Sequence, residues 1–128
     1  MVHAAGCETI EEMDAADAAV SKIHDWPGVN SFYSHFRQCD DGSISEGVSA
    51  TVVSFLAHRW GTFDQLEKIT DKDKTFESWL LNHIDTTVDD RDLEIIVKNA
   101  TDKCPGSDGK FCEKIGSAAK QALQDMKK

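Results

Sequence analysis

The chain contains little proline, little tyrosine and no long hydrophobic run. Among its 128 residues are 2 prolines and 1 tyrosine, and both prolines, Pro27 and Pro105, stand where a helix is expected to stop or turn. No run approaches the roughly 18 consecutive apolar residues that a membrane-spanning helix requires. We therefore expect no membrane span.

Basic residues are also few. The sequence has 14 lysines and arginines against 23 aspartates and glutamates, which gives a net charge of −9 and a pI of about 4.9. Nucleic acids and anionic membranes are polyanions, which bind proteins through clustered lysine and arginine side chains. The composition therefore argues against both as partners.

No catalytic or cofactor motif is present. The chain has no G-x-S-x-G sequence, its five histidines show no H-x-x-x-H spacing, and its cysteines form no C-x-x-C pair. Paired carboxylates are abundant, but in so acidic a chain their spacing carries no specificity. We expect neither an enzyme nor a metal or cofactor site, and we keep a small enzyme of unrecognised type only as the weakest alternative.

The four cysteines predict two disulfides. Cys104 and Cys112 flank a turn-rich connector, and closing so short a loop typically stabilises a protein by about 2–3 kcal/mol. Pairing these two leaves Cys7 with Cys39, although four cysteines allow three connectivities and the sequence excludes none of them. The alternative is a cytosolic protein with four free thiols.

The first residues resemble the end of a signal peptide. Val2 and Ala4 are aliphatic and small residues at the two positions that signal peptidase reads, although no apolar segment precedes them. Together with the cysteines they predict an exported protein, periplasmic or secreted, with natural maturation near Ala4 and Ala5. Residues 1–7 are expected to form a flexible N-terminal segment with the signal-peptide remnant, and residues 8–128 a single helical domain.

Apolar residues recur with helical spacing along nearly the whole chain, which predicts an all-α fold. Ser43 followed by Glu46, and Thr62 followed by Gln65, match the capping-box pattern that opens a helix. Short connections predict an orthogonal or bundle-like array of six to seven short helices. The expected helices cover about 8–25, 29–38, 44–60, 62–69, 74–85, 89–102 and a last segment, capped by Ser107 or Asp108, that reaches Lys127-Lys128.

The first helix is expected to pack through one apolar stripe and to end at Trp26-Pro27-Gly28. The stripe of the first helix consists of Ile10, Met13, Ala16, Val20 and Ile23.

An N-glycosylation sequon, Asn99-Ala100-Thr101, falls in the middle of a later helix and matters only in a secreted eukaryotic chain.

Negative charge is concentrated near the N-terminus. Residues 1–48 contain nine acids and two bases, a charge of −7, whereas the rest of the chain contributes only −2. Such a distribution steers a cationic partner through its electric field. The alternative is that the charged faces are merely solvated and keep the protein soluble.

These features together predict a small exported acidic helical protein-binding module. In outline, and with no residue motif to carry the likeness, the chain resembles immunity and inhibitor proteins that neutralise cationic toxins or lytic enzymes. We expect a basic protein partner, with a homodimer as an alternative form of association. Exposed aromatic side chains would act as anchors, because they dominate the energy of many interfaces. The expected partner-binding residues are Glu8, Glu11, Glu12, Asp14, Asp17, Trp26, Tyr33, Asp40, Asp41 and Glu46.

A secreted carrier of a small apolar ligand is the alternative function. Such a carrier would hold its ligand between the helices, in an internal pocket of roughly 300 Å³ or more. The residues expected to line this pocket are Phe32, Phe36, Phe55 and Trp79.

Intact mass, measured with and without reductant, tests the disulfides and the export prediction that depends on them. Protein purified without reductant should gain four hydrogens on reduction, because two disulfides open. Four free thiols before reduction would contradict both the pairing and the export.

Overall fold

The computed structural model describes residues 7–105 and 109–128, and the regular structure in this part of the chain is helical, so the all-α prediction is confirmed. Residues 1–6 of the predicted N-terminal segment 1–7, and the predicted caps Ser107 and Asp108, lie outside the described residues. The α-helices are α1 (Ile10–Ser21), α2 (Trp26–Phe36), α3 (Gly42–His58), α4 (Phe63–Lys72), α5 (Lys74–Asn82), α6 (Asp90–Asp102) and α7 (Gly109–Met126), with 3-10 turns η1 (Arg37–Cys39) and η2 (Trp60–Thr62).

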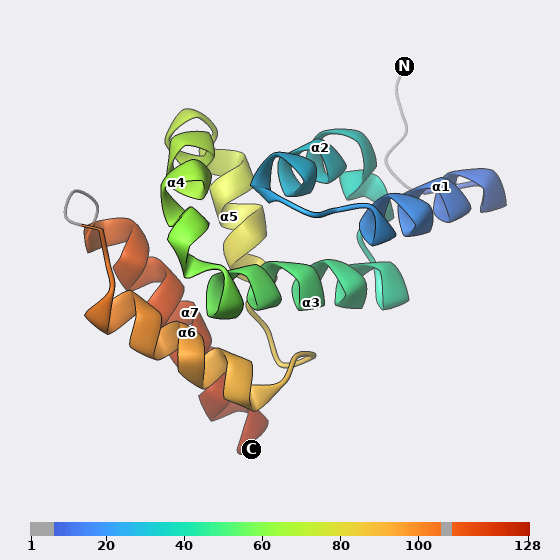
Figure 1. The fold of residues 1–128 in the computed structure, drawn as a ribbon. Helices are drawn as coiled ribbons and strands as arrows, with labels where there is room; N and C mark the ends of the chain where they lie inside the picture. The colour runs from blue at the N-terminus through green and yellow to red at the C-terminus, as the bar shows by residue number, and fades with distance from the viewer. Residues whose placement is uncertain (1–6, 106–108) are drawn as a thin grey trace.

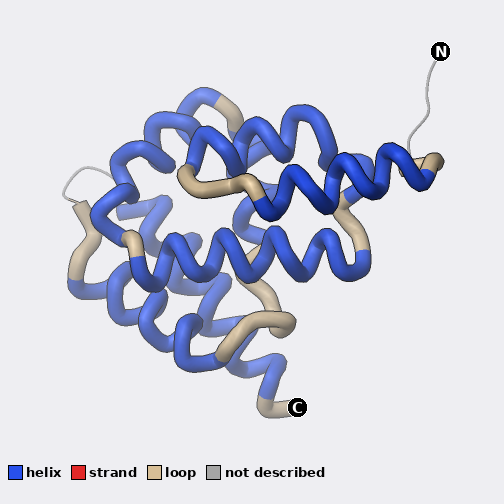
Figure 2. The backbone as a smooth tube through the Cα atoms, turned by 45° about the vertical axis from the view of Figure 1, so that its right-hand side comes forward, coloured by secondary structure: helices blue, strands red, loops and turns tan. Residues whose placement is uncertain are grey.

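Helix α3 crosses the middle of the molecule (Figure 1). Helices α1, α2, α4 and α5 lie on one side of it, and α6 and α7 run side by side along the other, as the tube view also shows (Figure 2). No helix in the described ranges is both long and apolar enough to cross a membrane. Because α3 is packed from both sides, much of its length is buried: Val48, Ser49, Val52, Val53, Phe55, Leu56 and Ala57.

The boundary between α1 and α2 differs from the predicted one. Helix α1 ends at Ser21, and the segment Trp26-Pro27-Gly28, expected to end it, instead opens α2. Asp25 caps this start, since its Oδ1 accepts a hydrogen bond of 2.8 Å from the backbone N–H of Gly28. A proline in the first turn removes no helical hydrogen bond, so Pro27 is accommodated directly after Trp26, at which α2 begins.

The start of α3 also differs from the capping box expected at Ser43 and Glu46. The cap is Asp41, whose Oδ1 accepts a hydrogen bond of 2.9 Å from the N–H of Gly42. Gly42 has φ +53°, in the left-handed region that favours glycine, so the chain turns sharply into the helix at this residue.

The face that α1 turns toward the core consists of Ala16, which is fully buried, and of Ala19 and Val20, which are partly buried. By contrast, Ile10 is 74% exposed and Met13 is 43% exposed, so the predicted stripe is wrong in its first two members. The reason is that the N-terminal turns of α1 extend past the start of α3 (Figures 1 and 2), whereas the close contact with α3 lies at the other end of α1. There a Cβ atom added to Gly47 would lie 3.1 Å from Cγ1 of Val20.

Both predicted disulfides are present, and the predicted pairing is confirmed. Cys7–Cys39 joins the segment before α1 to η1, and Cys104–Cys112 joins the segment after α6 to the first turn of α7. The described residues include no free cysteine. Cys39 and Cys112 are buried, so each bridge is anchored in the core.

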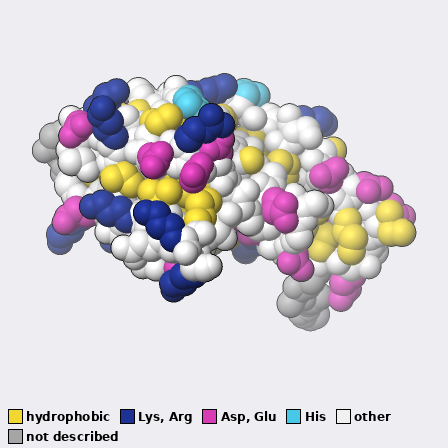
Figure 3. Space-filling model, turned by 90° about the horizontal axis from the view of Figure 1, so that it is seen from below, with side chains coloured by type: hydrophobic (Ala, Val, Ile, Leu, Met, Phe, Trp, Pro, Cys, Tyr) yellow, Lys and Arg dark blue, Asp and Glu magenta, His cyan; other side chains and the backbone are white. Residues whose placement is uncertain are grey.

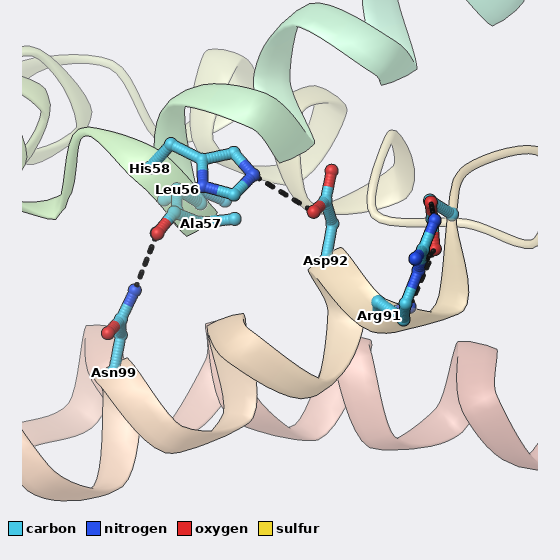
Figure 4. A network of polar contacts seen from close by, with 7 residues as sticks. Leu56, Ala57, His58, Arg91, Asp92 and Asn99 are labelled. Carbon is cyan, nitrogen blue, oxygen red and sulfur yellow. Dashed lines mark hydrogen bonds and ion pairs between the residues drawn. The ribbon is translucent and has the colours of Figure 1, made fainter.

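Side chains of α6 hold the C-terminal end of α3 (Figure 4). Nδ2 of Asn99 donates to the carbonyl oxygens of Leu56 and Ala57 at 3.0 and 3.2 Å, which the last turn of a helix otherwise leaves unpaired. Nε2 of His58 lies 2.9 Å from Oδ1 of Asp92. Asn99 is only 4% exposed, so in the folded protein its amide is not accessible for the glycosylation that the sequon would direct.

Replacing Asn99 with alanine should lower the free energy of unfolding by about 1–3 kcal/mol, because two carbonyl groups lose a buried donor. Urea denaturation measures the loss. The control is His58→Ala, which removes a half-exposed contact and should cost less than about 1 kcal/mol. Equal losses in the two variants would contradict this account of the α3–α6 contact.

Candidate functional site

Six of the predicted partner-binding acids are exposed at one end of the molecule. In the view from below, acidic side chains surround hydrophobic ones at the right-hand end, where α1 lies, while lysine and arginine side chains gather toward the other end (Figure 3). We call this region the acidic end. Its carboxylates are Glu8, Glu11, Asp14, Asp17, Asp41 and Glu46.

The two bases that the sequence places among these acids do not neutralise them. Lys22 directly follows the last turn of α1. Nη1 of Arg37 donates to the carbonyl oxygens of Tyr33 and Ser34 at 3.1 and 3.3 Å, and the guanidinium lies 5.0 Å from the centre of the Tyr33 ring. Within the described ranges, no lysine or arginine forms an ion pair with a carboxylate of the acidic end. Its charge is therefore directed to solvent.

Two predicted partner-binding acids have structural roles instead. The half-buried carboxylate of Glu12 accepts hydrogen bonds from the N–H of Glu8 at 3.2 Å and from Nε2 of Gln38 at 3.0 Å. In return, Oγ1 of Thr9 accepts from the N–H of Glu12 at 3.0 Å, an arrangement close to a capping box. The Thr9-x-x-Glu12 spacing in the sequence is the signal for it. Asp40, the second of these acids, belongs to a buried network described below.

The predicted aromatic anchors are also engaged inside the fold. Trp26 is 1% exposed, packs edge-on against Phe55 with 5.2 Å between the rings, and donates from Nε1 to Oγ1 of Thr62 at 2.9 Å. Trp26 is therefore a core residue, and its assignment to a partner surface is corrected. Tyr33 is half-buried, and its hydroxyl donates to Oγ1 of Thr75 at 2.9 Å.

A surface hollow lies between α1 and the start of α3. Its lining includes Met13, the Cys7–Cys39 disulfide and the segment 41–44, and its volume is about 450 Å³. Sequence reasoning missed this hollow because it assigned Ile10 and Met13 to the core. We call it the α1–α3 hollow.

A chain of buried and half-buried polar side chains connects α3, the end of α5 and the residue after η1. Oδ2 of Asp40 lies 2.8 Å from Nε2 of His83 and accepts a hydrogen bond of 2.7 Å from Nε1 of Trp79. Oγ of Ser49 lies 2.7 Å from Nδ1 of His83 and donates to Oδ2 of Asp85 at 2.7 Å. We call these five residues the buried network. Asp40 and Ser49 are distant in the sequence from Trp79, His83 and Asp85, so the sequence carries a local signal only for the last three.

The buried network has the residue types of a catalytic triad without its accessibility. Ser49 is fully buried and His83 is 4% exposed, so a substrate does not reach the hydroxyl. When both ring nitrogens of His83 carry a proton, each of these hydrogen bonds has a donor and an acceptor. The ring then donates to Asp40 and to Ser49, and the Ser49 hydroxyl donates to Asp85. The network therefore links helices and does not present a nucleophile.

The pKa of Asp40 is lowered from its ordinary value. Burial raises this pKa, but the hydrogen bond from His83, the positive charge of that ring and the hydrogen bond from Trp79 together outweigh burial. The ionised form of Asp40 is thus part of the folded structure.

Three residues that lie close together in the fold have ligand atoms near enough to one another to hold a metal ion. The ligand atoms of Cys7, Glu12 and Cys39 lie within 4.8 Å of one another. The two sulfur atoms are joined in the disulfide, and the Glu12 carboxylate already accepts two hydrogen bonds. Since a metal needs thiolate and free carboxylate ligands, this group serves as a covalent link in the oxidised protein.

The residues proposed to line a carrier pocket pack largely against other rings. The ring of Phe32 lies 5.7 Å from that of Phe36 and 6.3 Å from that of Trp79, while Phe55 packs on Trp26. The hollow that Phe32 and Phe36 line has a volume of about 210 Å³, below the roughly 300 Å³ expected of a ligand pocket. This packing does not favour a carrier.

Comparison with known proteins assigns no family to the chain. No protein-family model, no curated protein and no solved structure matches it.

Replacing Asp40 with asparagine should lower the free energy of unfolding at neutral pH, and this loss should shrink in acid. A carboxylate whose pKa is lowered by folding stabilises the folded state above its unfolded pKa of about 4, and this contribution disappears as the pH falls through the lower folded-state pKa. Urea unfolding from neutral pH to about pH 3 measures the difference.

The matched control is Asp14→Asn, which removes an exposed carboxylate and should change the free energy of unfolding by less than about 0.5 kcal/mol. A loss for Asp40→Asn that does not vary with pH would contradict the role given to the Asp40 carboxylate.

Proposed function

We propose that this protein is a small exported binding protein that recognises a cationic protein through its acidic end. The class that fits best is an immunity or inhibitor protein, with a basic toxin or lytic enzyme as its partner. One observation carries the proposal: the exposed carboxylates of α1 are in no ion pair with a described base, and they stand beside the exposed side chains of Ile10 and Met13.

The uneven charge distribution supports binding over simple solubility. Residues 1–48 carry −7 of the net charge, and the rest of the chain, with 14 acids and 12 bases, is nearly balanced. A field of a single sign at one end raises the rate of association with an oppositely charged protein. The exposed apolar side chains add contact area that carboxylates alone do not provide.

The two disulfides support an exported location. Disulfides persist in oxidising compartments such as the periplasm and the extracellular space, and they are rare in the cytosol. Covalent links also stabilise a small domain whose first helix buries mainly small side chains.

The test begins with capture of the partner by the oxidised protein from the exported proteins of the producing organism, followed by affinity measurements on the purified pair at increasing NaCl concentration. We expect a partner of basic pI. The triple variant Glu11→Gln/Asp14→Asn/Asp17→Asn should weaken binding by about ten-fold at low salt, mainly through the association rate, and the difference should shrink as salt screens the charges.

The control is Asp64→Asn/Glu94→Gln/Asp102→Asn, which changes the net charge equally at exposed positions of α4 and α6. This variant should keep the wild-type affinity. A partner of acidic pI, or equal weakening by the two triple variants, would refute binding through the acidic end.

A further inference from the structure

We infer that the α1–α3 hollow is the docking site for a basic amphipathic segment of the partner. This segment would insert an aliphatic or aromatic side chain into the hollow and place lysine or arginine side chains against the carboxylates around it. The inference rests on the proposed function and specifies the chemistry of the partner at the same end of the molecule. The hollow is lined by Cys7, Met13, Gln38, Cys39, Asp41, Gly42, Ser43 and Ile44.

One large apolar side chain at the hollow, and another one turn away from it, are exposed to solvent. Met13 lines it and is 43% exposed, and Ile10, one turn earlier on α1, is 74% exposed. These two residues share a face of the helix with Asp14 and Asp17, since the four positions follow the i, i+3, i+4, i+7 spacing. Covering the apolar pair with a partner removes apolar surface from water, which favours binding.

The walls of the hollow are already fixed. The disulfide Cys7–Cys39 forms part of them, Nε2 of Gln38 donates to the carboxylate of Glu12 on α1, and Asp41 caps α3. A partner therefore has little to order on binding, which lowers the entropic cost of association. The volume of about 450 Å³ lies in the range of sites that enclose a small ligand or a few side chains.

The charge around the hollow selects a basic segment among the candidate occupants. Asp41 lines it, and Asp14 and Asp17 stand on the same stripe of α1 as the apolar pair. In a symmetric contact, a second copy of this chain would bring these carboxylates face to face, and like charges oppose such a contact. A neutral apolar molecule would use the apolar wall and leave the carboxylates unpaired. A segment with both apolar and cationic side chains complements the apolar wall and the carboxylates together.

An NMR titration of the oxidised, nitrogen-15-labelled protein tests the site directly. The probe is a synthetic helical peptide of leucine and lysine with one apolar face. We expect amide shift changes concentrated in residues 10–17 and 41–44, and binding that weakens as NaCl is added. A matched peptide with serine in place of leucine should bind about ten-fold more weakly, and one with glutamate in place of lysine should not bind.

Two variants separate the hollow from the charge. Ile10→Ser/Met13→Ser removes the exposed apolar pair, and Ser43→Phe fills the hollow from an exposed position of its lining. Each should weaken binding of the leucine–lysine peptide by about ten-fold and leave the far-UV circular dichroism unchanged, because all three altered positions are exposed. The control variant Asp64→Asn/Glu94→Gln/Asp102→Asn should bind the peptide as the wild type does.

The outcomes distinguish this inference from the proposed function. Shift changes confined to other surfaces, or binding that neither hollow variant weakens, would overturn the docking site. If Glu11→Gln/Asp14→Asn/Asp17→Asn still weakens that binding, the proposed function stands without the hollow. Absence of salt-dependent binding to both the peptide and the captured partner would overturn both. Shift changes at residues 10–17 that depend on protein concentration alone, together with a dimer detected by sedimentation, would show that a second copy of the chain occupies the hollow. This result would overturn the inference that a basic segment binds there.

Discussion

The arrangement of the helices depends on the short connection between α2 and α3, residues 37–41. Its side chains reach in different directions: Gln38 to Glu12 of α1, Cys39 to Cys7, and Asp40 to the end of α5. The next residue, Asp41, caps α3. Because these links come from consecutive residues, a displacement of the connection would move α1, α3 and α5 relative to one another.

This connection matters most for α1, which contributes little large apolar surface to the core. Its fully buried residue is an alanine, and its larger apolar side chains near the N-terminus are exposed. Burial of small side chains stabilises a helix weakly, so the disulfide and the Glu12–Gln38 contact hold α1 in place. The side chains of Ile10 and Met13 thereby become available for contacts outside the chain. The surface proposed to bind a partner thus depends on covalent attachment of its helix.

The helices could be predicted because apolar residues repeat with the helical period, which is a local pattern in the sequence. The disulfide pairs could be predicted because four cysteines have only three ways to pair. The inward face of α1 could not be predicted from hydropathy, which ranks isoleucine and methionine above alanine, because the position at which α1 extends past α3 exists only in the folded chain. Trp26 and Asp40 likewise form hydrogen bonds inside the fold with Thr62 and His83, which are distant in sequence. The exposure of the remaining acids followed directly from their charge.

The Cys7–Cys39 bridge also bears on how the molecule withstands proteases. It encloses α1, the turn after it and α2 in one covalent ring, with a sequence separation of 32 between the bridged residues. A single peptide-bond cut anywhere inside that ring, for instance in the turn near His24, leaves the two fragments joined. The nicked chain would keep its mass apart from one added water, and only reduction would release the piece that carries the carboxylates of α1.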